Sequence, residues 1–328
     1  MIKKYFIIPV FLISVWQVLS AQNLEFHHNS SINSIADTAI INNLIDSALY
    51  LSSTEYSNSL LLLDEAFDLA TTINYKQGIG DVYYVRSRVY YYKDNYPAAI
   101  KYLNKSKSIY QETGSLKGMA NYYFGSGCLE NLYGDDIKAI RAFQNAMKFE
   151  EKRKSIKGKS KILNSLASVN SKMKNYNIAL NYAKKALELK KKIGNEIEIS
   201  NTLTNLGKIY QQMDSLEKAE SYLNEALLLR KKSQDKRRIA GSLYGIAQIN
   251  NIQNKPIEAK KKLMEAYSIF KSLDEKTGQV ICLLELSKAY NKLGIQHESK
   301  TAIENAISIS KITKNSQLLK DSYKQYAE

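Results

Sequence analysis

Hydrophobic and polar positions along this chain follow the spacing of amphipathic helices that come in pairs. In residues 200–239, Leu203, Leu206 and Tyr210 keep the three-and-four spacing of one helix face. After a polar break at residues 214–215, a second segment repeats that spacing with Leu216, Ala219, Leu223 and Leu227. A helix pair this short cannot bury its apolar faces alone, so neighbouring pairs must stack.

Small residues recur every 40 positions, in three series that each keep one phase. The first series is Ala66, Ser106, Ala146, Ala186, Ala226, Ala266 and Ala306. The second is Ser47, Ser87, Gly127, Ala167, Gly207, Ala247, Ser287 and Ala327, and the third is Ser59, Ala99, Ala139, Ala179, Ala219, Ala259 and Ser299. Small side chains at fixed phase let helix backbones approach closely once per repeat. The period predicts an all-α fold, a right-handed solenoid of stacked antiparallel helix pairs.

The predicted repeat domain covers residues 38–328, with seven 40-residue repeats over 40–319 and a partial eighth helix. The break inside a repeat carries turn residues, such as Gly134, Asn95, Asn175 and Gly294. Gly and Asn suit the left-handed residue that ends a helix, so we expect that conformation at these positions. Pro97 and Pro256 fall where second helices begin, the position where a missing N–H costs least.

These features resemble the tetratricopeptide repeat, which has Leu-Gly, then Tyr, a turn, and then spaced Ala, aromatic or Leu, and Ala. The matching residues are Leu206, Gly207, Tyr210, Ala219, Leu223 and Ala226, and again Ala139, Phe143 and Ala146. The period is longer than the family's usual value of about 34. Long-period versions are similar to repeats of bacterial regulatory and sensor proteins. The resemblance implies a scaffold that binds a protein or peptide, and it leaves the partner open.

Residues 1–21 have the features of a secretory signal peptide. Lys3 and Lys4 precede a largely apolar stretch over 5–19, and small residues follow at Ser20 and Ala21. An uncleaved anchor is the weaker alternative, because a spanning helix needs about 20 apolar residues. We expect a bacterial protein exported to the periplasm or secreted, with a linker over 22–37 and no membrane span in the mature chain.

Charge is spread unevenly along the chain. Residues 22–147 contain 10 Lys and Arg against 13 Asp and Glu, whereas residues 148–328 contain 35 against 19. The cations cluster at the ends of second helices and in the hinges that follow them, at 152–154, 190–192, 230–232 and 236–238. Stacking would align them into a basic ridge. The ridge has two interpretations: its cations stabilise helix C-termini, or they form a site for an anionic partner. Export disfavours nucleic acid as that partner.

No pattern of catalytic or cofactor-binding residues stands out. Histidine is limited to His27, His28 and His297, too few for a zinc site of about four ligands. The glycine-containing segments 78–81 and 125–127 do not follow strands, and Asp135-Asp136 reads as a helix start. Cys128 and Cys282 lie four repeats apart, beyond the roughly 7 Å that a disulfide allows between Cα atoms. We therefore expect a non-enzyme with two free thiols, no metal and no cofactor.

The first helices of such a solenoid line its inner face, where partners bind. By repeat phase, the predicted groove comprises Tyr84, Arg88, Tyr91, Asn121, Phe124, Asn164, Asn201, Lys208 and Gln211. Its N-terminal part is aromatic with one Arg, which suits apolar side chains of a partner. Its middle is rich in amides, which pair with peptide backbone.

Two functions remain open from the sequence. The first is an exported, non-enzymatic scaffold that holds a protein or peptide in its groove. The second is the extracytoplasmic sensor portion of a signal-transduction protein, such as a membrane histidine kinase or a transcription regulator, whose effector domain lies beyond this chain. The reading frame after residue 328 would distinguish them.

Overall fold

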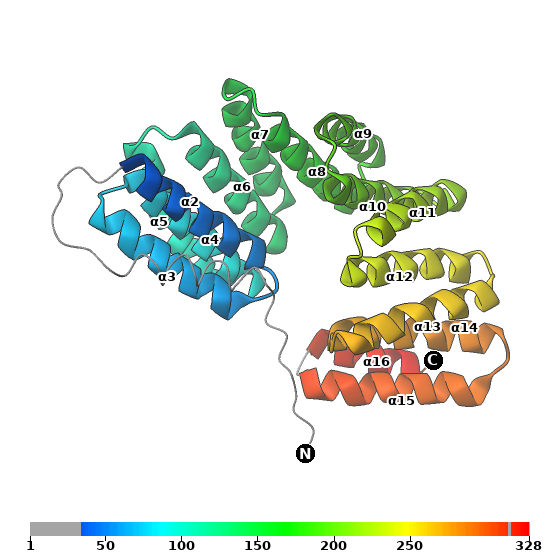
Figure 1. The fold of residues 1–328 in the computed structure, drawn as a ribbon. Helices are drawn as coiled ribbons and strands as arrows, with labels where there is room; N and C mark the ends of the chain where they lie inside the picture. The colour runs from blue at the N-terminus through cyan, green and yellow to red at the C-terminus, as the bar shows by residue number, and fades with distance from the viewer. Residues whose placement is uncertain (1–33, 314–315, 328) are drawn as a thin grey trace, which may run out of the picture.

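The computed structural model describes residues 34–313 and 316–327, which form fifteen α-helices and their connecting turns without any strand (Figure 1). The first helices of the pairs are α2 (Ser34–Leu51), α4 (Lys76–Tyr92), α6 (Leu116–Leu132), α8 (Ile156–Lys172), α10 (Glu196–Gln212), α12 (Lys236–Ile252), α14 (Lys276–Lys292) and α16 (Ser316–Ala327). The second helices are α3 (Tyr56–Thr72), α5 (Tyr96–Glu112), α7 (Asp136–Lys152), α9 (Tyr176–Ile193), α11 (Leu216–Lys232), α13 (Pro256–Ser272) and α15 (Gln296–Thr313). The predicted all-α solenoid is confirmed.

The helices begin at a slightly different phase from the predicted repeats. The helix α4 begins at Lys76, four residues before the predicted boundary at residue 80, and later first helices keep this offset. The helix α2 begins at Ser34, inside the range predicted as a linker. The predicted signal peptide, most of that linker and the pair His27-His28 lie outside the described residues.

One kind of turn recurs every 20 residues, so it separates the helices of a pair and also one pair from the next. Its left-handed residues are Asn74, Asp94, Gly114, Gly134, Lys154, Lys174, Gly194, Asp214, Gln234, Asn254, Asp274 and Gly294. The prediction is confirmed at Gly134 and Gly294 and wrong at Asn95 and Asn175. Each of those two follows the left-handed residue and stands at the N-cap of the next helix, where Asn95 Oδ1 accepts a hydrogen bond from the Ala98 N–H at 3.2 Å.

The small-residue series lie where helices touch. Every member of the first and third series is buried, and the second is buried apart from Ser47 and Ala327 at the two ends of the array. Gly207 shows why size matters, since a Cβ there would lie 2.8 Å from Leu223 Cγ and 3.2 Å from the Ala219 carbonyl oxygen. Backbones of α10 and α11 therefore approach too closely for a larger residue.

A second periodic contact joins successive pairs, and we call it the joint. In the second helices α5, α7, α9, α11 and α13, the last turn places one side chain beside the third residue of the next first helix. The ring of Tyr110 lies on Gly118, and the ring of Phe270 lies on Gly278. Where the third residue is not glycine the contact is polar, as in the Lys190 Nζ–Glu198 Oε2 ion pair of 2.9 Å.

The array curves with its first helices inside (Figure 1). Adjacent first helices touch in the pairs α2–α4, α4–α6, α8–α10, α12–α14 and α14–α16, whereas adjacent second helices do not pack in this way. Polar side chains bridge them: Asn205 Nδ2 in α10 donates to the Asn164 carbonyl in α8 at 3.3 Å. First helices therefore lie closer to one another than second helices do, so the layer of first helices forms the concave face of the array. Among the described residues, no helix is both long and apolar enough to cross a membrane.

Candidate binding groove

Four of the predicted groove residues line one hollow on the inner face. Tyr84, Arg88 and Tyr91 come from α4, and Phe124 comes from α6. The hollow has a volume of about 50 Å³, and its other lining residues are Ser87, Tyr92, Ala99, Leu103, Gly125, Cys128 and Leu129. The helical spacing of three, four and seven residues between the α4 members places them on one face, as their sequence pattern predicts.

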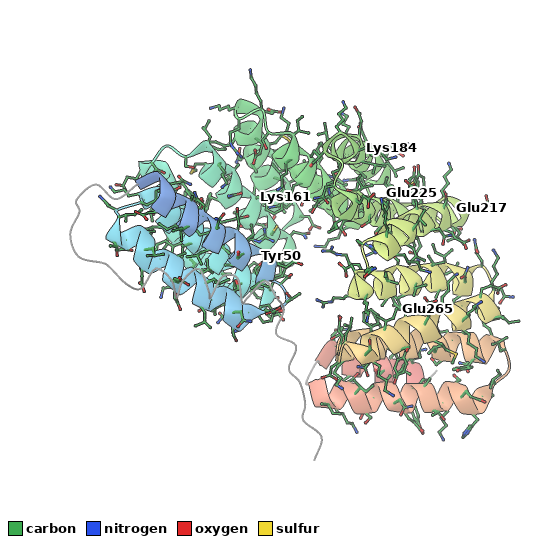
Figure 2. The ribbon with its side chains drawn as sticks, in the orientation of Figure 1. Tyr50, Lys161, Lys184, Glu217, Glu225 and Glu265 are labelled. Atoms are coloured by element: carbon green, nitrogen blue, oxygen red, sulfur yellow. The ribbon has the colours of Figure 1, made fainter. Side chains whose placement is uncertain are left out.

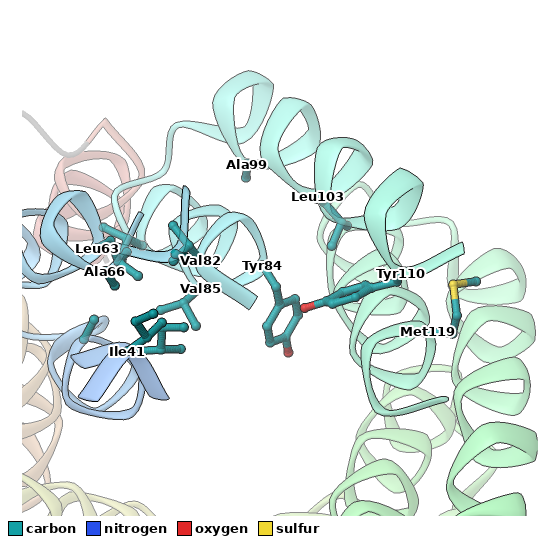
Figure 3. Packing of buried hydrophobic residues seen from close by; sticks show 14 of the residues in the cluster. Ile41, Leu63, Ala66, Val82, Tyr84, Val85, Ala99, Leu103, Tyr110 and Met119 are labelled. Carbon is teal, nitrogen blue, oxygen red and sulfur yellow. The ribbon is translucent and has the colours of Figure 1, made fainter. Parts of the chain in front are cut away.

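Tyr84 forms the base of this hollow. Its side chain is 4% exposed and points away from the cluster around Leu63 and Val82 (Figure 3). The Tyr84 hydroxyl is buried beside Arg88, which lies one helical turn further along α4 and interacts with it. Burial raises the pKa of this phenol, so it stays protonated at neutral pH and remains a donor.

Arg88 holds a charge at the edge of the hollow. Its Nη2 donates to the Tyr92 hydroxyl at 2.9 Å, and its guanidinium carbon lies 5.6 Å from the centre of the Tyr92 ring. The Tyr91 and Tyr92 rings meet edge to face at 5.5 Å. Within the described ranges, no carboxylate forms an ion pair with Arg88. Aromatic rings rather than acids therefore surround this cation.

Lys161 of α8 does not line the hollow itself, but it brings a second cation to the ring of Phe124, which does. Its Nζ lies 3.6 Å from the centre of the Phe124 ring, within the range of a cation–π contact. In Figure 2 it is labelled on the inner side of the arc, whereas Lys184 and Glu225 lie on the outer side. Burial, and then the charge of Arg88, lower the pKa of Lys161 to about 8. No acidic side chain of the described residues forms an ion pair with this amine.

The remaining predicted groove residues lie apart from the hollow, and several have structural partners. Asn164 receives the Asn205 hydrogen bond that links α8 and α10. Asn201 Oδ1 accepts from Arg230 Nη2 at 3.3 Å. Asn121 and Gln211 are half-buried, and Lys208 is exposed. The predicted groove is therefore one converged cluster followed by separate polar positions.

Comparison with known proteins agrees with the fold. Residues 159–232 and 80–113 match sequence profiles of the tetratricopeptide repeat. The chain is a tetratricopeptide-repeat solenoid. A search of curated protein sequences finds no match.

Solved structures of the same fold share little sequence with this solenoid. The Rap protein complexed with Competence and Sporulation Factor superposes with a TM-score of 0.69 at 17% identity, covering 86% of this chain and 79% of that one. The apo quorum sensor NprR from B. thuringiensis gives 0.60 at 15% identity, with 87% and 80% covered. A signal-transduction ATPase with a tetratricopeptide-repeat sensor from Pyrococcus horikoshii gives 0.63 at 18% identity, with 86% of this chain but 44% of that one covered.

Several residues at the hollow escaped the sequence prediction, and the repeat phase marks two of them: Cys128, which lines the hollow, and Lys161, which contacts the Phe124 ring. Lys161 lies 40 residues after Asn121 and 40 before Asn201, which were both predicted. Cys128 lies 40 residues after Arg88. The 40-residue spacing from predicted positions is therefore the sequence signal that identifies both residues.

The predicted basic ridge turns out to be partly a packing feature of the solenoid. Lys190 and Arg230 are the joint residues of their repeats and are buried, at 2% and 7% exposure. Arg230 Nη1 donates to Ser242 Oγ at 2.6 Å and to the Arg238 carbonyl at 3.2 Å. Other ridge cations have acidic neighbours, such as Lys192 Nζ at 2.9 Å from Glu188 Oε1. An anionic partner on the ridge stays a prediction.

The structure also places the cysteines, Asp135 and the two glycine-containing segments that the sequence analysis considered. Cys128 is half-buried and Cys282 buried, and both are free thiols as predicted. Asp135 caps α7, accepting from the Lys138 N–H at 3.0 Å, and segments 78–81 and 125–127 lie within α4 and α6. In the part of the chain that the structure describes, no three His, Cys, Asp or Glu side chains gather as metal ligands.

Proposed function

We propose that this solenoid is an exported, non-enzymatic scaffold whose inner face binds a segment of a protein or peptide. The observation that carries the proposal is the hollow at Phe124, where half-buried rings meet two cations without carboxylate partners. Aromatic and Arg residues in partly desolvated settings contribute most of the energy at protein interfaces.

Two neighbours in fold support the same class of function. One is described as a complex with Competence and Sporulation Factor, and another is described as a quorum sensor. Export is supported by the sequence of residues 1–21 alone. Mass spectrometry of the protein from a bacterial host should find a mature N-terminus near Ala21 or Gln22, and an intact Met1 on cytoplasmic protein would contradict export.

A sensor portion of a larger signalling protein is the second candidate. Its support is the likeness to the tetratricopeptide-repeat sensor of the signal-transduction ATPase, in which the matching region is less than half of the chain. Sequencing the reading frame beyond residue 328 tests it. A membrane helix and signalling domain there would favour the sensor, and a stop codon would favour the scaffold.

Site-specific photo-crosslinking tests where the partner binds. A benzophenone side chain is placed at Tyr91 in the hollow or, as the matched control, at Leu228 on the outer helix α11, where the side chain is 70% exposed. We expect an adduct in the native host from position 91 only, and its loss when Phe124 is also replaced by Ala. An adduct from position 228 alone would place the partner on the outer face and refute the proposal.

A further inference from the structure

We propose that the basic ridge is a docking surface for an anionic lipid bilayer, which the solenoid contacts through the turns that join successive pairs. The inference goes beyond the proposed function, because it concerns another surface and another class of partner. Three observations carry it. The charge lies at one edge of the array, several of the cations lie where a helix disfavours them, and exposed isoleucines lie between them.

Positive charge gathers in three turns between pairs, at residues 150–158, 190–198 and 230–238. These turns contain 13 Lys and Arg against 5 Asp and Glu, a net charge of +8. Successive helices are antiparallel, so all turns between pairs lie at one edge of the array. The Lys232 Nζ–Glu196 Oε1 ion pair of 2.5 Å joins two of the three turns directly. The basic ridge therefore faces a partner along this edge.

The opposite edge is almost uncharged. Its turns, which lie within pairs at 170–178, 210–218 and 250–258, contain 4 Lys and Arg against 3 Asp and Glu, a net charge of +1. In Figure 1 the turns from α12 to α13 and from α14 to α15 mark this edge, at the right of the view. Net charge keeps a protein soluble wherever it lies on the surface. Solubility therefore does not explain why one edge holds the charge.

Several ridge cations lie at the end of a helix that disfavours them. The first turn of α8 contains Lys157, and the first turn of α12 contains Lys236 and Arg237, whereas neither turn contains an acidic residue. Helix N-termini carry a partial positive charge, which attracts anions and repels cations. Stabilisation of helix C-termini explains the cations at 152–154 and 230–232, but it does not explain these three.

Four exposed lysines of the ridge turns lack a carboxylate partner. Among the described residues, no acidic side chain forms an ion pair with Lys154, Lys157, Lys231 or Lys236. Other cations of the ridge are already engaged, such as Lys190 in its joint and Lys192 with Glu188. Phosphate groups of a bilayer can therefore approach these four ammonium groups without displacing an existing ion pair.

Exposed isoleucines indicate which anionic partner the ridge fits. Ile156, between Lys154 and Lys157, is 47% exposed. Ile193 and Ile197 in the next turn are each 42% exposed. Proteins that lie on membranes combine Lys and Arg with apolar side chains, which enter the boundary between headgroups and acyl chains. Single-stranded nucleic acids stack their bases on aromatic rings, and the three turns contain no aromatic residue. The ridge therefore suits a bilayer better than a nucleic acid.

Binding through this edge leaves the hollow at Phe124 accessible. Tyr91 and Tyr92 lie in the last turn of α4, and Cys128 lies near the end of α6. Both helix ends lead into turns within pairs, so the hollow lies toward the edge opposite the ridge. The bilayer and a bound peptide are therefore compatible, and either proposal can fail without the other.

Co-sedimentation with lipid vesicles tests the inference. The chain is used from Gln22, so that the apolar stretch at 5–19 cannot bind lipid itself. The vesicles contain phosphatidylglycerol and phosphatidylcholine in equal amounts, or phosphatidylcholine alone. We expect the protein to bind the anionic vesicles at least about 100-fold more tightly than the neutral ones. This binding should be lost in about 0.5 M sodium chloride, where screening is strong. Equal binding to both kinds of vesicle would overturn the proposal.

A variant of the ridge tests where the bilayer binds. It carries Lys154→Gln, Lys157→Gln, Lys231→Gln and Lys236→Gln. Each lysine near an anionic surface contributes about fivefold to the affinity, so the variant should bind the anionic vesicles at least about 100-fold more weakly than the parent. Circular dichroism checks that it folds.

The matched control removes the same charge elsewhere. It carries Lys174→Gln, Lys184→Gln, Lys185→Gln and Lys255→Gln. Lys154 and Lys174 have left-handed φ values of 54° and 62°, and Gln234 occupies the same turn position with a φ of 54°, so Gln is compatible with both sites. The control should change binding by less than about threefold, since charges beyond a Debye length of about 10 Å contribute little. Equal losses in the two variants would refute the ridge as the docking surface.

The isoleucines distinguish a bilayer from a hydrophilic polyanion. Ile156→Ser with Ile197→Ser should weaken binding to the anionic vesicles by at least about tenfold, because it removes apolar contact with the lipid. Unchanged binding would refute this contact. Binding of the parent to heparin or to single-stranded DNA, without binding to the anionic vesicles, would overturn the bilayer as the partner.

Discussion

Replacing Gly207 by Ala measures the cost of crowding one close contact between helices. The added Cβ would lie 2.8 Å from Leu223 Cγ and 3.2 Å from the Ala219 carbonyl oxygen. Leu223 is 2% exposed and Ala219 contributes backbone, so neither yields easily and the helices α10 and α11 must separate. Overpacking of this kind costs about 1–3 kcal/mol of unfolding free energy.

Gly241→Ala in α12 is the matched control. A Cβ at Gly241 would meet no atom within 4 Å. Both glycines lie within helices, so both substitutions gain roughly 1 kcal/mol from helix propensity. The gain cancels in the difference between the variants, which leaves the packing cost alone. We expect Gly241→Ala to be more stable than the parent, and Gly207→Ala to be about 1–3 kcal/mol less stable than Gly241→Ala.

Guanidinium chloride unfolding, followed by far-ultraviolet circular dichroism, gives these free energies. Solenoids can unfold in parts, because each repeat contacts only its neighbours. Hydrogen exchange of α10 and α11 therefore provides a local reading of the same change. Equal stability of the two variants within about 0.5 kcal/mol, the usual scatter of neutral surface changes, would refute the close contact at Gly207.

Three further outcomes follow from individual contacts. Lys190→Met should lower the unfolding free energy by about 1–3 kcal/mol, because it removes the buried polar contact of a joint. The control Lys191→Met removes an exposed ion pair with Glu225 at 4.0 Å and should change the unfolding free energy by less than about 0.5 kcal/mol. Equal effects of the two substitutions would contradict the role of Lys190 in the joint. Tyr110→Phe removes a 2.7 Å hydrogen bond to buried Asp81 and should cost about 1–3 kcal/mol by chemical unfolding, so an unchanged midpoint would show that this bond is dispensable. Burial and then Glu285 raise the pKa of Cys282 to about 12, so iodoacetamide should label it at pH 9 only after unfolding, and rapid labelling of the folded chain would contradict its burial.

The repeat made most of the fold predictable from the sequence. Positions such as Ala66, Ala146 and Ala226 share one phase, and each is fully buried in the structure. Turn positions were predicted less well, because Asn serves both as a left-handed residue and as an N-cap. At Asn95 the second role applies, and Asp94 adopts the left-handed conformation instead.

The candidate site was predictable only in part. Periodicity indicates which face a residue occupies, so Tyr84, Arg88 and Phe124 were expected on one face, and they line one hollow. Periodicity does not indicate which residues of successive repeats meet, because this depends on how each pair packs on the next. For this reason the burial of Lys190 and Arg230 in the joints could not be predicted from the sequence. A run of cations has the same sequence pattern whether its side chains are exposed or packed.

The packing between first helices explains why Lys161 differs from the residues at its own phase. Asn121 and Asn201 are short amides, and Asn201 pairs with Arg230 inside the stack. Lys161 lies on α8, which packs against α10 but does not pack in the same way against α6. A side chain that reaches from α8 to the Phe124 ring of α6 must therefore be long, and Lys meets that requirement at 3.6 Å from the ring centre. An amide at this position would be too short to reach the ring, and Arg88 would then be the one cation beside Phe124. The wide spacing of α6 and α8 and the long side chain of Lys161 therefore define the site together.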